Sequence, residues 1–228
     1  MPLRSSAAPR GNRASGWHAR GAVNGVVLSL LVAVIVVVAP WAASAASGSG
    51  GHTVPAVAIY SGEFHVDYRT TNATIQNTFW NGSRWVQNTV PGPAATGDPA
   101  AGVYNGEFHV DYRATNATIQ NMFWNGSRWV RNAVPGPAAA GDPAVAVYNG
   151  EFHVDYRTTY APIHNSFWNG SQWVQTAAPG PPAAGDPTVA LYNGRFHIEY
   201  RATNKTIHNT FWNGSNWVHN TVPGPPAA

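Results

Sequence analysis

The chain has no cysteine among its 228 residues, which excludes disulfide bonds, thiolate catalysis and cysteine-based metal sites. Charged residues are also scarce, at 10% of the sequence, whereas hydrophobic residues make up 44% and aromatic residues 12%. A chain of this composition is too apolar and too aromatic to be a disordered tail. We therefore expect a folded protein that is stabilised by packing and by sheet hydrogen bonds alone.

Acidic residues are absent from the first 46 residues, which hold four arginines. The rest of the chain carries nine basic and 10 acidic residues, so the formal charge of +3 comes from the N-terminus. Without that segment the chain offers no net positive charge to a polyanion. Nucleic acid is therefore not an expected partner.

The only long apolar run, Val26–Ala39, follows these arginines and precedes the small residues Ala43, Ser44 and Ala45. This order matches a secretion signal with an A-x-A cleavage site. The run is about 14 residues long, which is shorter than the ~20 residues that span a bilayer. We expect a signal peptide over residues 1–46 and an extracellular mature protein without a membrane partner; a retained membrane anchor is the alternative.

The remainder of the chain repeats with a period of 44 residues, and each copy carries a sequence close to that of Tyr104–Trp129. A period in the low forties is typical of propeller blades with four strands each. A short linker at residues 47–55 precedes the repeats. The four copies are expected at residues 56–99, 100–143, 144–187 and 188–228.

Apolar and polar residues alternate within each copy, which predicts strands and no helix after the signal segment. In the second copy, Asn105 and Gly106 form a strong hairpin signal between Ala101–Tyr104 and Glu107–Arg113. The odd-numbered positions of Glu107–Arg113 hold Glu, His, Asp and Arg, and the even-numbered positions hold Phe, Val and Tyr. This strand is therefore expected to have one polar face and one apolar face.

A second hairpin is expected at Asn125-Gly126, between strands at residues 118–124 and 127–134. A two-residue loop there would place Met122 opposite Trp129 and Trp124 opposite Ser127. The two tryptophans would then be diagonal neighbours on one side of the hairpin. Each of the first three copies ends in a Pro-Gly-Pro and Gly-Asp-Pro stretch that cannot continue a ladder and links one blade to the next, and the fourth copy has the Pro-Gly-Pro part alone.

Together these patterns predict an all-β fold, a β-propeller of four four-stranded blades. Such repeats complete their core by stacking on their neighbours. Four blades can close as a small ring, or a homodimer can complete a larger ring of eight blades. The sequence leaves both alternatives open.

A Trp-Asn-Gly-Ser-x-Trp segment recurs in every copy, after the alternating strand that ends in Tyr-Arg. This pattern resembles the blade repeat of bacterial and fungal β-propeller lectins, whose fucose-binding members carry a similar Trp-Asp-Gly-x-Gly-Trp turn. The resemblance implies a sugar held between adjacent blades by an Arg, a Glu and a Trp. In the first copy the corresponding Arg position falls near Val66 and the Glu position near Asn77, so two of these groups differ. The segments lie at residues 80–85, 124–129, 168–173 and 212–217.

The residues themselves also fit a sugar, which needs an aromatic platform and a few fixed donors and acceptors. Arginine offers a planar fork to adjacent hydroxyls, and tryptophan offers the largest apolar face. The alternative is structural: the acid and Arg of each copy would pair between neighbouring blades, and one or both tryptophans would fill the core. The single His on the polar face of this strand in each copy does not make a metal site, and no cofactor is expected. The candidate ligand-binding residues are His65, Arg69, Trp85, His109, Arg113, Trp129, His153, Arg157, Trp173, His197, Arg201 and Trp217.

The sequence therefore predicts a non-catalytic, multivalent lectin that binds glycans or cell-surface polysaccharide. One alternative is a propeller scaffold that binds protein or cell-wall polymer without a discrete sugar pocket. A glycosidase is less favoured, because a catalytic site needs a pair of carboxylates or an activated nucleophile and normally breaks repeat symmetry. No single copy carries such a departure.

Overall fold

The computed structural model describes residues 53–159 and 163–228. The expected signal peptide lies outside these residues, as does most of the expected linker. The described residues form β-strands and no helix. No helix that could cross a membrane is found among them. The strands are β1 Ala56–Tyr60, β2 Glu63–Arg69, β3 Ile75–Trp80, β4 Trp85–Val90, β5 Ala100–Tyr104, β6 Glu107–Arg113, β7 Ile119–Trp124, β8 Trp129–Val134, β9 Ala144–Tyr148, β10 Glu151–Arg157, β11 Ile163–Trp168, β12 Trp173–Ala178, β13 Thr188–Tyr192, β14 Arg195–Arg201, β15 Ile207–Trp212 and β16 Trp217–Val222.

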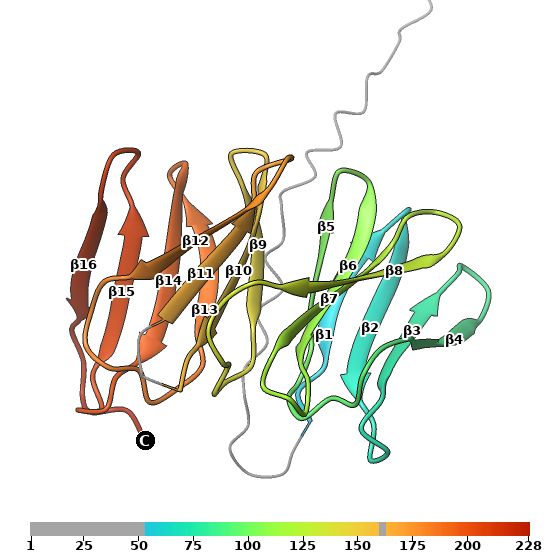
Figure 1. The fold of residues 1–228 in the computed structure, drawn as a ribbon, viewed down its shortest axis with the longest axis horizontal. Coiled ribbons are helices and arrows are strands. Elements are labelled where there is room, and N and C mark those ends of the chain that lie inside the picture. Colours follow the sequence, from blue (N-terminus) through green and yellow to red (C-terminus); the bar gives the residue numbers. More distant parts are fainter. Residues whose placement is uncertain (1–52, 160–162) are drawn as a thin grey trace, which may run out of the picture. The chain divides into compact units, whose positions relative to one another are not determined.

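These strands form four antiparallel sheets, each with its four strands in sequence order. Figure 1 shows the sheets following one another along the chain, from β1–β4 to β13–β16. The first strand of each sheet lies next to the first strand of the following one, as β1 does to β5 and β5 to β9. The predicted all-β fold of four-stranded blades is confirmed, with first strands that begin at residues 56, 100, 144 and 188.

The first hairpin of each blade has the predicted two-residue loop. Tyr104 pairs with Glu107, and the two residues between them, Asn105 and Gly106, have φ angles of 49° and 77°. Positive φ at both loop positions is the signature of a type I′ turn, which matches the right-handed twist of the strands. Asn-Gly therefore fixes the register that sets the two faces of β6.

The second hairpin differs from the prediction, because its loop has four residues rather than two. Trp124 pairs with Trp129 and Met122 pairs with Arg131. The side-chain Oδ1 of Asn125 accepts hydrogen bonds from the backbone N–H groups of Ser127 and Arg128, at 3.1 and 3.0 Å. This side chain closes a longer turn, so the two tryptophans face each other directly instead of lying on a diagonal.

Adjacent blades pack face to face, so β6 and β10, the second strands of the two inner blades, are buried on both sides. On β6, Phe108, Val110 and Tyr112 are buried, and so are His109 and Asp111 from the opposite face. The cores lie between blades: one cluster combines the β6 side chains Phe108, Val110 and Tyr112 with Ile75 of β3 and Val90 of β4. Stacking therefore completes the core, as expected for a repeat fold.

Candidate functional site

Three pockets lie at equivalent places between consecutive blades, with volumes of about 350, 230 and 200 Å³. One blade supplies a histidine, a glutamate, two polar side chains and a phenylalanine, and the next blade supplies a phenylalanine and two tryptophans. The first pocket is lined by Tyr60, Glu63, His65, Asn77, Phe79, Asn88 and Thr89 of the first blade and by Phe108, Trp124 and Trp129 of the second.

A buried polar triad lies at each pocket and fixes its histidine. In the first blade, the Nδ2 of Asn77 donates to Oδ1 of Asp67 at 3.0 Å and lies 3.1 Å from Nδ1 of His65. Because the amide donates, Nδ1 of the histidine accepts, and the proton of the neutral ring lies on Nε2. The same contacts recur at His109 and His153, so each pocket has an imidazole with a defined donor.

Aromatic rings hold the histidine from both sides. The ring of His65 stacks on Phe79 of its own blade at a centroid distance of 4.9 Å, and Phe108 of the next blade lies at 4.5 Å. Burial between these rings disfavours the charged imidazolium. It lowers the pKa of His109 and of His153 to about 4, so both rings are neutral at neutral pH.

Burial has the opposite effect on the carboxyl group of the triad. It raises the pKa of Asp67 to about 7, although the hydrogen bond from Asn77 partly offsets this rise. The pKa of Asp111 and that of Asp155 are raised well above the ordinary value for the same reason. Burial therefore reduces the negative charge of each triad, which suits a site for a neutral polar ligand.

A glutamate at the pocket rim faces the free nitrogen of the histidine. The Oε2 of Glu151 is 3.6 Å from Nε2 of His153, and the corresponding distance from Glu63 to His65 is 3.9 Å. Neither Nε2 atom has a hydrogen-bond partner, although both are buried. A ligand hydroxyl beside both groups can accept from Nε2–H and donate to the carboxylate, which satisfies the buried donor.

The opposite wall of each pocket is a pair of tryptophans from the next blade. Trp124 and Trp129 meet edge to face with a centroid distance of 5.9 Å, and both line the first pocket. Trp168 and Trp173 line the second pocket, and Trp212 and Trp217 line the third. The sequence left open which member of each pair faces a ligand; the structure places both at the pocket.

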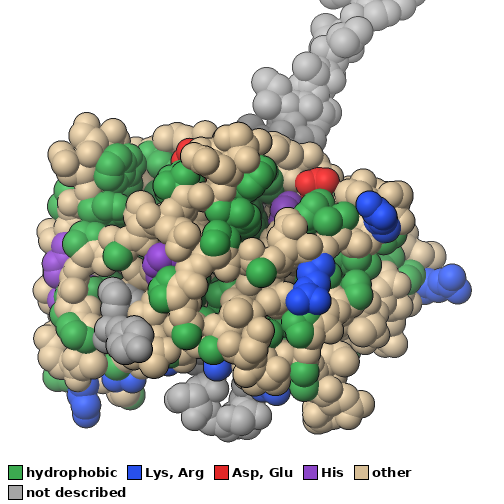
Figure 2. Space-filling model, in the orientation of Figure 1, with side chains coloured by type: hydrophobic (Ala, Val, Ile, Leu, Met, Phe, Trp, Pro, Cys, Tyr) green, Lys and Arg blue, Asp and Glu red, His purple; other side chains and the backbone are tan. Residues whose placement is uncertain are grey.

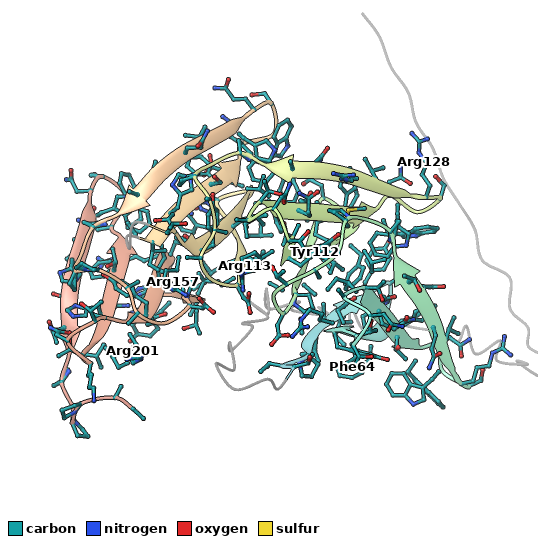
Figure 3. All side chains as sticks on the ribbon, turned by 60° about the horizontal axis from the view of Figure 1, so that its bottom comes forward. Phe64, Tyr112, Arg113, Arg128, Arg157 and Arg201 are labelled. Atoms are coloured by element: carbon teal, nitrogen blue, oxygen red, sulfur yellow. The ribbon has the colours of Figure 1, made fainter. Side chains whose placement is uncertain are left out.

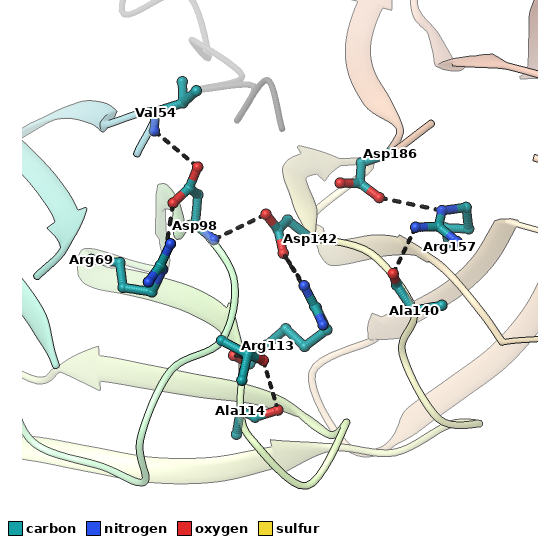
Figure 4. A network of polar contacts seen from close by, with 10 residues as sticks. Val54, Arg69, Asp98, Arg113, Ala114, Ala140, Asp142, Arg157 and Asp186 are labelled. Carbon is teal, nitrogen blue, oxygen red and sulfur yellow. Dashed lines mark hydrogen bonds and ion pairs between the residues drawn. The ribbon is translucent and has the colours of Figure 1, made fainter. Parts of the chain in front are cut away.

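The predicted arginines lie elsewhere. Arg113 is 3.2 Å from Asp142, and Arg157 is 3.5 Å from Asp186 (Figure 4). Each aspartate comes from the Gly-Asp-Pro link that enters the next blade. Figure 3 shows Arg113, Arg157 and Arg201 along the series of sheets, with Arg128 far from them at a turn. None of the four predicted arginines lines one of the three pockets.

The link aspartates also bind backbone groups of the neighbouring link. The Oδ2 of Asp142 accepts from the backbone N–H of Asp98 at 3.0 Å, and Oδ2 of Asp98 accepts from that of Val54 at 2.8 Å (Figure 4). Arg69 lies 3.8 Å from Asp98. These contacts join consecutive blades, so the arginines have a structural role, as the alternative held. Their partner is the link aspartate, however, and not the acid of the strand, which bonds an asparagine of its own blade.

The other predicted residues divide between the pockets and the two outer faces of the described sheets. Trp85 on β4 and His197 on β14 lie on those outer faces and line none of the three pockets. Figure 2 shows His and acidic side chains reaching one face of the molecule between apolar side chains. The predicted residues that do line the pockets are His65, His109, His153, Trp129, Trp173 and Trp217.

Sequence reasoning missed the rim glutamates and the amides that orient the histidines. Glu107 lies two residues before His109 on the same strand face, so its place beside the histidine follows from the strand period. Asn121 pairs with Asp111 across β6 and β7. The signal that could have found it is the register of this hairpin, which places Asn121 opposite Asp111.

No metal centre is evident in the described part of the chain, where no group of three His, Cys, Asp or Glu side chains could hold an ion. No model of a protein family matches the sequence, and no curated protein matches it either. Solved structures do match.

A mutant form of AofleA from Arthrobotrys oligospora is 18% identical with a TM-score of 0.61, over 82% of this chain and 59% of that one. A mutant of the Aleuria aurantia lectin in complex with α-methyl-L-fucoside is 17% identical with a TM-score of 0.56, over 71% and 56%. The SapL1 lectin in complex with α-methyl fucoside is 15% identical with a TM-score of 0.56, over 78% and 63%. This chain thus spans less than two thirds of each. The Aleuria aurantia lectin is a six-bladed β-propeller. The chain has the fold of these β-propeller lectins, as the Trp-Asn-Gly-Ser-x-Trp repeat implied.

Proposed function

We propose that this protein is a multivalent lectin that binds a neutral sugar in each pocket between consecutive blades. The observation that carries the proposal is the repeated, unsatisfied Nε2 donor of a neutral histidine, which lies beside a rim glutamate in a pocket that a pair of tryptophans also lines. A sugar presents hydroxyl groups and an apolar C–H face, and the pocket offers a complement to each.

The orientation of the sugar follows from the two walls. One hydroxyl would lie between His109 and Glu107, accept from the imidazole and donate to the carboxylate. The C–H face would then lie toward Trp168 and Trp173 of the next blade. The three pockets of the first, second and third blades share these residue types, so one glycan class should occupy all of them.

Repetition gives the chain avidity. Three weak sites that engage one surface act together through effective concentration, which raises overall binding by roughly 10²–10⁴-fold without new contacts. We propose cell-surface or polymeric glycans as the ligands, with the protein acting outside the cell after cleavage of its signal segment. The protein would act by binding alone, without catalysis.

A glycan array with the purified protein tests the proposal, followed by competition with the free monosaccharide of the best binder. The triple variant with Trp129, Trp173 and Trp217 each changed to Ala should lose binding while retaining strand content by circular dichroism. Trp85→Ala, compared at a concentration where the protein is monomeric, is the control, because Trp85 occupies the same repeat position but lines none of the three pockets.

The outcomes separate the alternatives. Array binding that the monosaccharide competes away, and that the triple variant loses, supports a lectin. Binding to polymer or protein that no monosaccharide competes away would instead indicate a scaffold without a sugar pocket. Release of reducing sugar from the bound glycan would indicate that the protein is a glycosidase.

A further inference from the structure

The two outer faces of the four described sheets expose positions that are buried or half-buried in the other sheets. On the first sheet Phe64 is 42% exposed, whereas its equivalents Phe108, Phe152 and Phe196 are each 1% exposed. Trp85 of the same sheet is 51% exposed. We call Val57, Phe64 and Trp85 the leading face.

The opposite face of the last sheet shows the complementary pattern. Tyr192 is 66% exposed, whereas Tyr104, its equivalent on the second sheet, is 6% exposed. Val222 is 41% exposed, against 5% for its equivalent Val134. We call Tyr192, His197 and Val222 the trailing face.

Inside the chain, these two kinds of face always meet. The tyrosine and histidine of one blade contact the phenylalanine of the next: Phe152 lies 5.8 Å from Tyr104 and 4.5 Å from His109, between ring centroids. The same arrangement joins the first blade to the second and the third to the fourth. His197 stacks on Phe211 of its own blade, but no phenylalanine of a following blade covers its other side among the described residues.

We propose that the trailing face of one copy docks on the leading face of a second copy, with Phe64 of the second copy covering Tyr192 and His197. The joint would repeat the contact that the chain already makes three times between its own blades. Burial of several large apolar side chains drives such a contact. The joint is heterologous, so it closes a ring if the rotation between copies permits and otherwise continues as an open series.

The joint also completes a further pocket, whose role as a sugar site rests on the proposed function. The trailing face would supply His197 and Asn209, and Trp80 and Trp85 of the second copy would form the aromatic wall. The rim would differ from that of the other pockets, because Arg195 replaces the glutamate and lies over the Phe211 ring at 5.5 Å. The described residues of a single copy supply only one wall of this pocket at each outer face.

One contact of the internal joints is missing at this joint. Within the chain, Arg69, Arg113 and Arg157 each pair with the link aspartate of the next blade. Val54 holds the equivalent link position on the first blade, where its N–H binds Asp98 as the N–H of Asp98 binds Asp142. Arg201 would therefore meet a valine instead of a carboxylate, and the joint between copies should be weaker than the internal ones.

Light scattering over a dilution series, without sugar, tests the proposal. The purified protein should assemble as its concentration rises. Phe64→Arg and Tyr192→Arg each place a charge on an exposed position, so both variants should fold and each alone should be monomeric. An equal mixture of the two should form a heterodimer, because each variant retains the face that the other has lost.

Val54→Asp provides a gain-of-function arm, because it supplies the missing partner for Arg201 and should strengthen association by roughly twofold to fivefold. A monomeric wild type at every concentration would overturn the proposal, as would assembly that survives Phe64→Arg or a mixture that stays monomeric. None of these readouts involves sugar, so a failure here leaves the three internal pockets untouched. If the wild-type protein assembles but binds no sugar, the proposed function is overturned instead.

Discussion

The buried carboxyl group of Asp67 should make the protein less stable as the pH rises, and Asp67→Asn should remove that loss. The side chain is fully buried, its Oδ1 accepts from Asn77, and its Oδ2 has no partner. Burial raises its pKa to about 7, compared with ~3.9 in an unfolded chain. The folded state therefore holds a proton that the unfolded state has released between these two pH values.

The magnitude follows from the shift. A rise of about 3 pKa units corresponds to ~4 kcal/mol of stability that is present below pH 4 and lost as the pH passes 7. Asparagine keeps the oxygen that accepts from Asn77 and cannot ionise. Relative to the wild type, Asp67→Asn should therefore gain ~4 kcal/mol between pH 4 and pH 8.

Urea denaturation of both proteins at pH 4 and pH 8 measures this difference, and the comparison cancels every other titrating group. Glu199→Gln is the matched comparison: its carboxyl occupies the same place in the fourth blade but is partly exposed, and burial raises its pKa too. Glu199→Gln should also gain stability relative to the wild type as the pH rises, but by less than Asp67→Asn. A variant that is equally destabilised at both pH values would refute the reasoning, because it would mean that the aspartate is held as an anion.

Two further changes separate structural residues from ligand-binding ones. Arg113→Gln breaks the pair with Asp142 and should lower the free energy of unfolding, measured by urea denaturation, by about 1–3 kcal/mol. The sugar affinity of the three pockets should stay unchanged in a titration. A loss of sugar affinity without a loss of stability would show that Arg113 contacts the ligand. Asn121→Ala removes the amide that bonds Asp111 and orients His109. It should cost ~2–4 kcal/mol and weaken the second pocket, whereas unchanged sugar binding at that pocket would show that the histidine needs no orienting partner.

The strands and blades could be predicted from the sequence because their signals are local. The Asn-Gly turn at Asn105 and the alternation along β6 fixed the first hairpin within a few residues. The second hairpin shows the limit of that reasoning. The same Asn-Gly dipeptide begins a four-residue loop there, because the Asn125 side chain bonds two later backbone amides.

The composition of the site was harder to predict, because it depends on which blade faces which. His109 and Arg113 share one face of a strand, yet the histidine borders a pocket and the arginine pairs with a link aspartate. The two side chains have different surroundings only because of the way the next blade stacks on this one. Trp129 was predicted as a platform and lines the pocket, but Trp85, the equivalent residue of the first copy, lies on an outer face.

The most direct test of the central claim is the number of sugar sites per chain, measured by isothermal titration with the monosaccharide that the array identifies. At a concentration where the protein is monomeric, the wild type should bind three sugars per chain. Each of Trp129→Ala, Trp173→Ala and Trp217→Ala should lower that number by one, and Trp85→Ala should leave it at three. A site count that none of the three substitutions lowers would contradict the assignment of the pockets between blades.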